Sequence, residues 1–246
     1  MPDLTYEVRD GVGTITIDRP ERRNALSGEA ITAFLESLDQ AESDDAVRVL
    51  CVTGAGDKVF CSGADLMSAF AGGDALAGMR AYADLLKRMH TFPKPFVARV
   101  AGHCLAGGLG LLLSCDIAIG REDGKYWTPE LNVGLFPMMI GALIFRNVQR
   151  KKAMELIYTG RKYSAAEAAD MGLITRAASA DDFESAVEQT LAAVAEKAPV
   201  ALRIGRQALA YRGRAPVLPH DGVADRIARF PVPDHDGLAL VGDAHG

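Results

Sequence analysis

A glycine-rich stretch between two apolar runs, residues 97–116, is the feature that most restricts how this chain can fold. It reads VARVAGHCLAGGLGLLLSCD. The run before the glycines predicts a buried strand, and the leucine run after them predicts a buried helix. The glycines permit positive φ and let a ligand approach the backbone closely. The unpaired N–H groups and partial positive charge at the helix start could bind an anion or stabilise an oxyanion formed during a reaction.

The same glycines would also suit close packing of a helix against a strand, which needs only small residues. A second stretch favours the functional interpretation because it repeats the same order of segments. Residues 47–66 read VRVLCVTGAGDKVFCSGADL, an apolar strand, a glycine turn, a short apolar segment and then SGADL. Two such units could each direct one backbone N–H at a shared oxygen atom.

Together these stretches resemble the crotonase superfamily, the enoyl-CoA hydratase/isomerase family, and the resemblance covers most of the chain. It implies that the main-chain amides of Ala64 and Gly107 hold the thioester oxygen of an acyl-CoA. It also implies that Glu130, in the pair Pro129-Glu130, acts as acid or base beside the reacting carbons. Coenzyme A would then be part of the substrate, with no separate cofactor and no metal.

The resemblance also assigns contacts with coenzyme A. The segment RPERRNALS, residues 19–27, is similar to a family segment that lines the adenine and phosphate end of the ligand. The candidate contacts from this segment and from the first glycine stretch are Arg22, Arg23, Ala25, Ser62, Asp65 and Leu66. Arginines suit phosphate because they make charge-assisted hydrogen bonds, although a solvated basic loop would explain the same two arginines.

The pattern of apolar residues predicts an α/β fold. The resemblance implies successive ββα units that form a spiral of two roughly perpendicular sheets. We expect this spiral core over residues 1–197, and a C-terminal helical or lid region over residues 198–246 that mediates oligomerisation. Family members are commonly trimers or dimers of trimers, so we expect a homotrimer or hexamer.

Local signals predict individual elements. A hairpin turns at Asp10-Gly11, Ser27 caps a helix to about Gln40, and a capping box starts at Ser164. Further expected elements are strands 47–53, 116–120 and 173–174, and helices 79–90, 153–158 (ended by Gly160), 164–171 (ended by Gly172), 181–197 and 199–211.

Composition excludes several other classes. The net charge is −5 and no basic block suggests nucleic-acid binding. No apolar run reaches membrane-spanning length, and the polar N-terminus lacks the apolar core of a signal peptide, so we expect a cytoplasmic protein. The four cysteines, Cys51, Cys61, Cys104 and Cys115, form no CxxC pair, which argues for small buried side chains and against a zinc site or disulfides.

The chain departs from the family pattern at Gly110, where hydratases carry a second glutamate. Hydration of a double bond needs one group to activate water and another to handle the α-proton. Family isomerases manage with a single base that matches Glu130. The residue count therefore favours an isomerase, while an enoyl-CoA hydratase with an altered site and a non-catalytic acyl-CoA-binding protein stay open as alternatives.

Two further departures concern the surroundings of the site. Trp127 stands where relatives have a small residue, and its indole could narrow the acyl pocket or fill the core. An apolar setting of Trp127, Leu131, Val133 and Phe136 is expected to raise the pKa of Glu130. The tail, residues 213–246, contains four prolines and lacks the basic finish that closes over coenzyme A in relatives.

Overall fold

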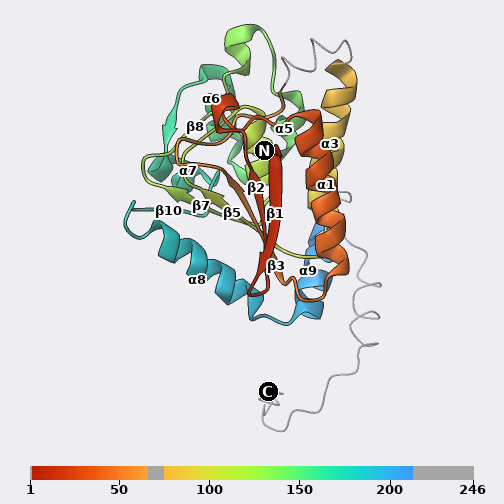
Figure 1. Cartoon of the computed structure of the whole chain (residues 1–246). Helices are drawn as coiled ribbons and strands as arrows, with labels where there is room; N and C mark the ends of the chain where they lie inside the picture. Colours follow the sequence, from red (N-terminus) through yellow and green to blue (C-terminus); the bar gives the residue numbers. More distant parts are fainter. Residues whose placement is uncertain (1, 66–74, 213–246) are drawn as a thin grey trace, which may run out of the picture. The chain divides into compact units, whose positions relative to one another are not determined.

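The computed structural model describes residues 2–65 and 75–212 (Figure 1). The chain divides into a unit of residues 1–210 and a second unit of residues 211–246. Only the last two residues of the final helix belong both to the second unit and to the described part, so the description below concerns the first unit. The tail, residues 213–246, and the predicted contact Leu66 lie outside the described residues.

A six-stranded sheet forms the larger of two sheets, in the order β1-β2-β3-β5-β7-β10. Strands β1 and β2 form the predicted antiparallel hairpin, with positive φ at Asp10 and Gly11 in the turn, and the later neighbours pair in parallel. The bounds are β1 (Leu4–Arg9), β2 (Val12–Ile17), β3 (Val49–Gly54), β5 (Phe96–Val100), β7 (Ile117–Arg121) and β10 (Arg176–Ala178).

A four-stranded sheet, in the order β4-β6-β8-β9, lies beside the larger one. Its strands are β4 (Val59–Cys61), β6 (His103–Leu105), β8 (Lys125–Trp127) and β9 (Tyr163–Ser164). Each of β3, β5 and β7 in the large sheet is followed along the chain by a short strand of the small sheet, β4, β6 and β8 respectively. This repeated step confirms an α/β fold with two sheets, and it brings successive strand ends to one region.

Helices cover both faces of the large sheet (Figure 1). Their bounds are α1 (Gly28–Ser43), α3 (Ala75–Thr91), α4 (Gly107–Leu113), α5 (Met138–Asn147), α6 (Arg150–Thr159), α7 (Ala165–Met171), α8 (Phe183–Ala195) and α9 (Pro199–Arg212), with short 3₁₀ helices at Pro20–Arg22 and Glu130–Val133. Helices α1 and α3 lie side by side, and α8 packs on the opposite face. Neighbouring residues of β7 show this division, because Ala118 belongs to the main core cluster and Ile119 to a separate cluster with Phe183 of α8. Among the described residues no helix is long and apolar enough to cross a membrane.

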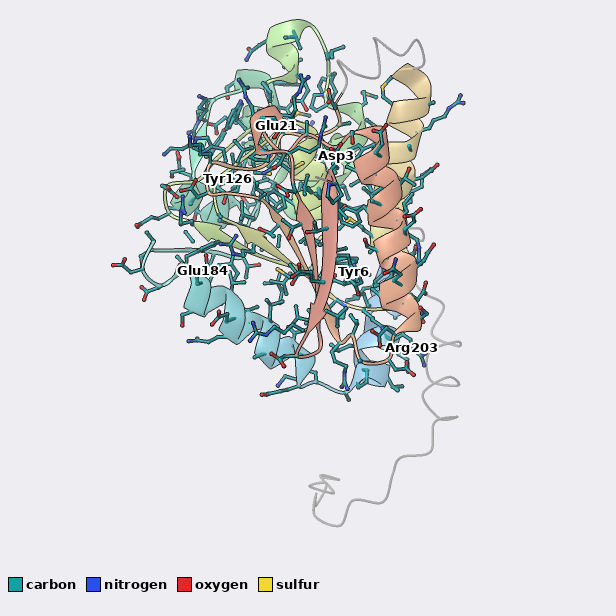
Figure 2. The ribbon with its side chains drawn as sticks, viewed as in Figure 1. Asp3, Tyr6, Glu21, Tyr126, Glu184 and Arg203 are labelled. Carbon is teal, nitrogen blue, oxygen red and sulfur yellow. The ribbon has the colours of Figure 1, made fainter. Side chains whose placement is uncertain are left out.

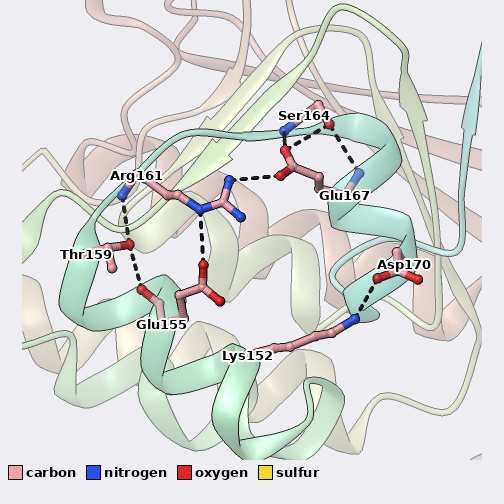
Figure 3. A network of polar contacts seen from close by, with 7 residues as sticks. All are labelled: Lys152, Glu155, Thr159, Arg161, Ser164, Glu167 and Asp170. Carbon is pink, nitrogen blue, oxygen red and sulfur yellow. Dashed lines mark hydrogen bonds and ion pairs between the residues drawn. The ribbon is translucent and has the colours of Figure 1, made fainter.

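The predicted helix caps are confirmed. The Ser27 side chain accepts the Ala30 N–H at 3.0 Å, and Gly160 and Gly172 end their helices in the left-handed conformation. Ser164 and Glu167 form the capping box of α7 (Figure 3).

The prediction of a strand at Leu173-Ile174 is wrong. The N–H groups of Leu173 and Ile174 donate to the Ala168 carbonyl at 2.8 and 3.3 Å. Closing the end of α7 uses the donors that a strand would need for its ladder. Pairing with β7 therefore begins two residues later, in β10.

Candidate active site

Ala64, the first predicted amide donor, follows β4 and forms an isolated bridge with Leu26. The Leu26 N–H donates to the Gly63 carbonyl and the Asp65 N–H donates to the Leu26 carbonyl, both at 2.8 Å. Both bonds use neighbours of Ala64, and the Ala64 N–H donates to no acceptor in the described part of the chain. The preceding Gly63 has φ of +95°, a conformation that favours glycine.

Gly107, the second predicted donor, is the first residue of α4. As the first helical residue it has no intrahelical acceptor for its N–H, and none elsewhere among the residues that the structure describes. Ala106 before it has φ 49° and ψ −132°, an unusual conformation for a residue with a β-carbon. The Ala106 N–H donates to the Trp127 carbonyl at 3.1 Å, which fixes the turn from β6 into α4.

The two predicted donors lie side by side. A β-carbon placed on Gly63 would lie 2.7 Å from the Gly107 nitrogen, and one placed on Gly107 would lie 3.3 Å from the Ala64 nitrogen. A β-carbon on Gly108 would overlap the Cys61 carbonyl. The backbones of the two glycine stretches are therefore in direct contact, and we call residues 61–64 and 106–108 the loop crossing.

Glu130 opens the 3₁₀ helix that follows β8 and Pro129. Its side chain is half-buried, and its Oε2 atom is buried without a hydrogen-bond partner among the described residues. Burial raises the pKa of Glu130, and a hydrogen bond from its own backbone N–H partly opposes the shift. An unpaired buried carboxylate oxygen of this kind suits proton transfer.

The predicted apolar setting of Glu130 needs correction. Leu131, Val133 and Phe136 are 38%, 73% and 44% exposed, because the 3₁₀ helix and the following turn direct them outward. The Trp127 ring meets His103 edge-on at 6.0 Å and the Lys162 amine at 4.9 Å. The direction of the expected pKa shift is right, but it arises from burial of the carboxylate and not from these three exposed side chains.

Tyr82 of α3 is a site residue that the sequence reasoning missed. It is 1% exposed, and its hydroxyl donates to the Gly107 carbonyl. The signal that could have identified it was its hydroxyl on the predicted helix 79–90, because a buried phenol needs a polar partner. A β-carbon on Gly110 would lie 2.6 Å from Ile140 Cγ2, 3.0 Å from the Tyr82 hydroxyl and 3.3 Å from Leu86 Cδ1.

Arg19 is a second missed residue, and it engages two of the predicted coenzyme A contacts. Its Nη1 donates to the Ala25 carbonyl at 2.7 Å and to Asp65 Oδ2 at 3.1 Å. Its Nε pairs with Asp3 at 2.9 Å, beside the start of α1 (Figure 2). Arg19 thus supports the loop that contains Ala64 through its ion pair with Asp65. The Arg19 and Asp65 side chains are only 12% and 9% exposed.

The remaining candidates lie at the surface or in the core. Arg22 and Arg23 are exposed, and Ser62 is half-buried. Cys61 is buried, which raises the pKa of its thiol to about 12, so it stays protonated and unreactive. Its sulfur accepts the Gly63 N–H at 3.3 Å. A cavity of about 410 Å³ lies away from these residues, and none of the candidate site residues lines it. Its lining residues are Ile117, Arg176, Gln189, Thr190, Ala193, Val194, Lys197 and Leu202.

Comparison with known proteins decides the family. A model described as enoyl-CoA hydratase/isomerase matches residues 7–221. The chain belongs to the enoyl-CoA hydratase/isomerase family. A Thermus thermophilus protein provisionally named an enoyl-CoA hydratase is 34% identical over 203 residues, which are 80% of each chain.

Solved structures of the enoyl-CoA hydratase/isomerase family have the same fold. Human enoyl-CoA hydratase domain-containing protein 3 superposes with a TM-score of 0.82 at 26% identity, covering 87% of this chain and 86% of its own. A carnitinyl-CoA dehydratase from Mycobacterium avium 104 gives 0.77 at 33% identity, covering 85% and 82%. Family membership makes this chain an acyl-CoA enzyme, and the choice of reaction depends on the site.

Proposed function

We propose that the chain is an enoyl-CoA isomerase, in which the N–H groups of Ala64 and Gly107 hold the thioester oxygen and Glu130 moves the proton. The observation that carries the proposal is the loop crossing, where two backbone N–H groups that have no acceptor among the described residues lie side by side. Donors aimed at a single oxygen stabilise the negative charge that develops when an enolate forms. The same contact requires the glycines that both sequence stretches contain.

Glu130 would serve first as base and then as acid. It takes a proton from C2 of a 3-enoyl-CoA, and the electron pair of the broken C–H bond moves into the enolate, whose oxygen the two amides hold. The same proton returns to C4, so the double bond moves from C3–C4 to C2–C3 and nothing is consumed. Burial raises the pKa of the Glu130 carboxyl, and this makes it a stronger base than an exposed glutamate while its acid can still return the proton.

The surroundings of Gly110 favour isomerisation over hydration. Ile140, Tyr82 and Leu86 occupy the space that a side chain at this position would need. A second carboxylate would have to displace Ile140, so Glu130 acts without a carboxylate partner from this position. One proton-transfer group is enough for a double-bond shift, whereas hydration needs a second group to activate water.

The direct test offers purified protein a 3-enoyl-CoA and a 2-enoyl-CoA. We expect turnover of the first, and a Glu130→Gln variant should lose at least about 10²–10⁴-fold in kcat, the range for one acid–base group. Glu188→Gln, an exposed change on α8, is the matched control and should keep full activity. Turnover of the 2-enoyl-CoA alone would indicate a hydratase, and tight binding without turnover in calorimetry would indicate a binding protein.

The pH profile supplies a separate test of Glu130 as the base. Burial raises its pKa, so the rate should rise with pH through a value above the ordinary glutamate pKa of about 4.3. A rate that stays flat as the pH is lowered from 8 to about 4.3, the ordinary glutamate pKa, would contradict this assignment.

Contacts with coenzyme A are proposed for the exposed side chains of Arg22 and Arg23. Replacing both with alanine should raise KM by about tenfold and leave kcat unchanged, because the phosphates lie far from the reacting carbons. Added salt should weaken binding to the wild type more than to the double variant.

We further propose that the chain assembles as a homotrimer or hexamer. Large apolar side chains are exposed on one segment next to Glu130, namely Leu131, Val133, Leu135, Phe136, Met138, Met139 and Phe145. Exposed apolar clusters of this extent usually mark a contact surface. Sedimentation analysis checks the assembly, and a monomer at micromolar concentration contradicts it.

A further inference from the structure

Tyr82 is buried against α4 and makes a polar contact with one of the two proposed donors. Its hydroxyl donates to the carbonyl of Gly107, the residue whose nitrogen lies in the loop crossing. Burial raises the pKa of Tyr82 well above its usual value, the Cys61 and Cys104 thiols act in the same direction, and the Leu111 N–H partly opposes them. The phenol therefore stays protonated and remains a donor throughout the working pH range.

The Tyr82 hydroxyl packs against α4 at Gly110, where the helix has no side chain. It lies beside Gly110 and donates to the Gly107 carbonyl, the group that an α-helix normally joins to the Leu111 N–H. A larger residue at Gly110 would exclude it, since a β-carbon there would lie 3.0 Å from the hydroxyl. Gly110 therefore has a structural consequence apart from the missing second carboxylate.

The start of α4 needs an external support. The helix has only seven residues, GGLGLLL, and glycine is a poor helix former. Ala106, at the N-cap position, makes no side-chain capping bond and has the unusual φ of 49°. The backbone bond from Ala106 to Trp127 fixes the turn before the helix, but it does not contact Gly107 itself. Tyr82 supplies the side-chain bond to Gly107.

We propose that Tyr82 is a positioning residue for the second oxyanion donor: its bond to the Gly107 carbonyl anchors the first turn of α4, and so holds the Gly107 nitrogen in place at the loop crossing. The inference rests on the proposed function of that N–H. The hydroxyl itself does not touch the reacting atoms, so its loss should weaken stabilisation of the enolate without removing a proton-transfer group. Positioning errors of this kind lower kcat more than they raise KM.

Tyr82→Phe removes the hydroxyl and keeps the ring contacts of a fully buried side chain. We expect kcat on a 3-enoyl-CoA to fall about tenfold, KM to change less than about twofold, and the acid limb of the pH profile, set by Glu130, to stay in place. Tyr126→Phe is the matched control, because Tyr126 (Figure 2) is also buried and its hydroxyl has no partner among the described residues. It should keep full activity.

A spectroscopic measurement separates this inference from the proposed function. Butanoyl-CoA labelled with ¹³C at the thioester carbonyl reports the strength of the donors through the fall of its C=O stretching frequency on binding. The wild type and Tyr126→Phe should show the same fall, and Tyr82→Phe a smaller one. No fall in the wild type would overturn the proposed oxyanion site, whereas equal falls in wild type and Tyr82→Phe, or an unchanged kcat, would overturn the role of Tyr82 alone.

Discussion

The loop crossing and the connection between α6 and α7 are stabilised in opposite ways. At the crossing, backbone touches backbone, and a β-carbon on Gly63 would lie 2.7 Å from the Gly107 nitrogen. In the connection, charged side chains meet at the surface, where Arg161 pairs with Glu155 at 3.3 Å and Glu167 at 2.9 Å (Figure 3).

The two regions also differ in their polar groups without partners. Within the part of the chain that the structure describes, the N–H groups of Ala64 and Gly107 at the crossing lack partners, and so does the Glu130 Oε2 atom. In the α6–α7 connection, Ser164 and Glu167 satisfy each other's groups through the capping box. Unsatisfied groups beside an interlocked backbone are typical of a site that awaits a ligand, while satisfied surface groups serve folding alone.

The largest effect that separates the regions is expected from Gly108→Ala. The added methyl group would overlap the Cys61 carbonyl, so the crossing must open, and we expect activity to fall more than about 100-fold with a loss of about 1–3 kcal/mol of stability. Gly141→Ala in α5 is the control, since a β-carbon there has nothing within 4 Å. It should keep activity and gain up to about 1 kcal/mol. Equal behaviour of the two variants in kinetics and thermal unfolding would remove the distinction.

A second pair of variants compares an ion pair beside the loop crossing with one between α6 and α7. Asp65→Asn weakens the buried pair with Arg19 that supports the first donor loop, and should cost about 1–3 kcal/mol and lower kcat/KM about tenfold. Asp170→Asn breaks the exposed pair with Lys152 (Figure 3), and should cost about 0–1 kcal/mol with unchanged kcat/KM. Chemical denaturation and steady-state kinetics measure both. Loss of activity in Asp170→Asn at full stability would contradict the comparison.

A third variant affects only the connection. Ser164→Ala removes the cap of α7 and should cost about 0.5–2 kcal/mol of stability while leaving kcat and KM unchanged. Ser185→Ala in α8 is a suitable reference, because Ser185 is exposed and, among the described residues, its side chain accepts only the Gln189 side-chain amide. An altered kcat in Ser164→Ala would show that the connection influences the site.

The smallest expected effect is a difference in how two glutamates respond to pH. The backbone of Ser164 and the Arg161 side chain lower the pKa of Glu167 to about 2, so its stabilisation is present above the unfolded pKa of about 4.3 and is lost as pH falls toward 2. Burial raises the pKa of Glu130, so its charge destabilises the fold at pH above that value. Glu167→Gln should therefore lower Tm at pH 7, and Glu130→Gln should raise it, with both differences shrinking toward low pH.

The sequence predicted the α6–α7 connection well because its signals are local. The capping box spans Ser164 to Glu167, and Gly160 and Gly172 each end a helix within the same turn. Such signals act over three or four residues, so a short stretch of sequence contains all the information needed to predict these helix ends. The hairpin at Asp10-Gly11 was predictable for the same reason.

The crossing was only partly predictable. The two glycine stretches and Glu130 were found from their motifs, but the strands that align them, such as β6, are three residues long and pair only with distant segments. No local pattern identifies such strands. Tyr82 and Arg19 were missed because their partners, Gly107 and Asp65, lie 25 and 46 residues away.

Trp127 has a practical consequence, because it is the one tryptophan of the chain. Its ring lies against Lys162 and His103, its carbonyl accepts the Ala106 N–H, and Glu130 follows three residues later. All indole fluorescence therefore originates next to the second donor loop. The unlabelled protein carries its own optical reporter, and stopped-flow emission can time the arrival of a thioester without any dye.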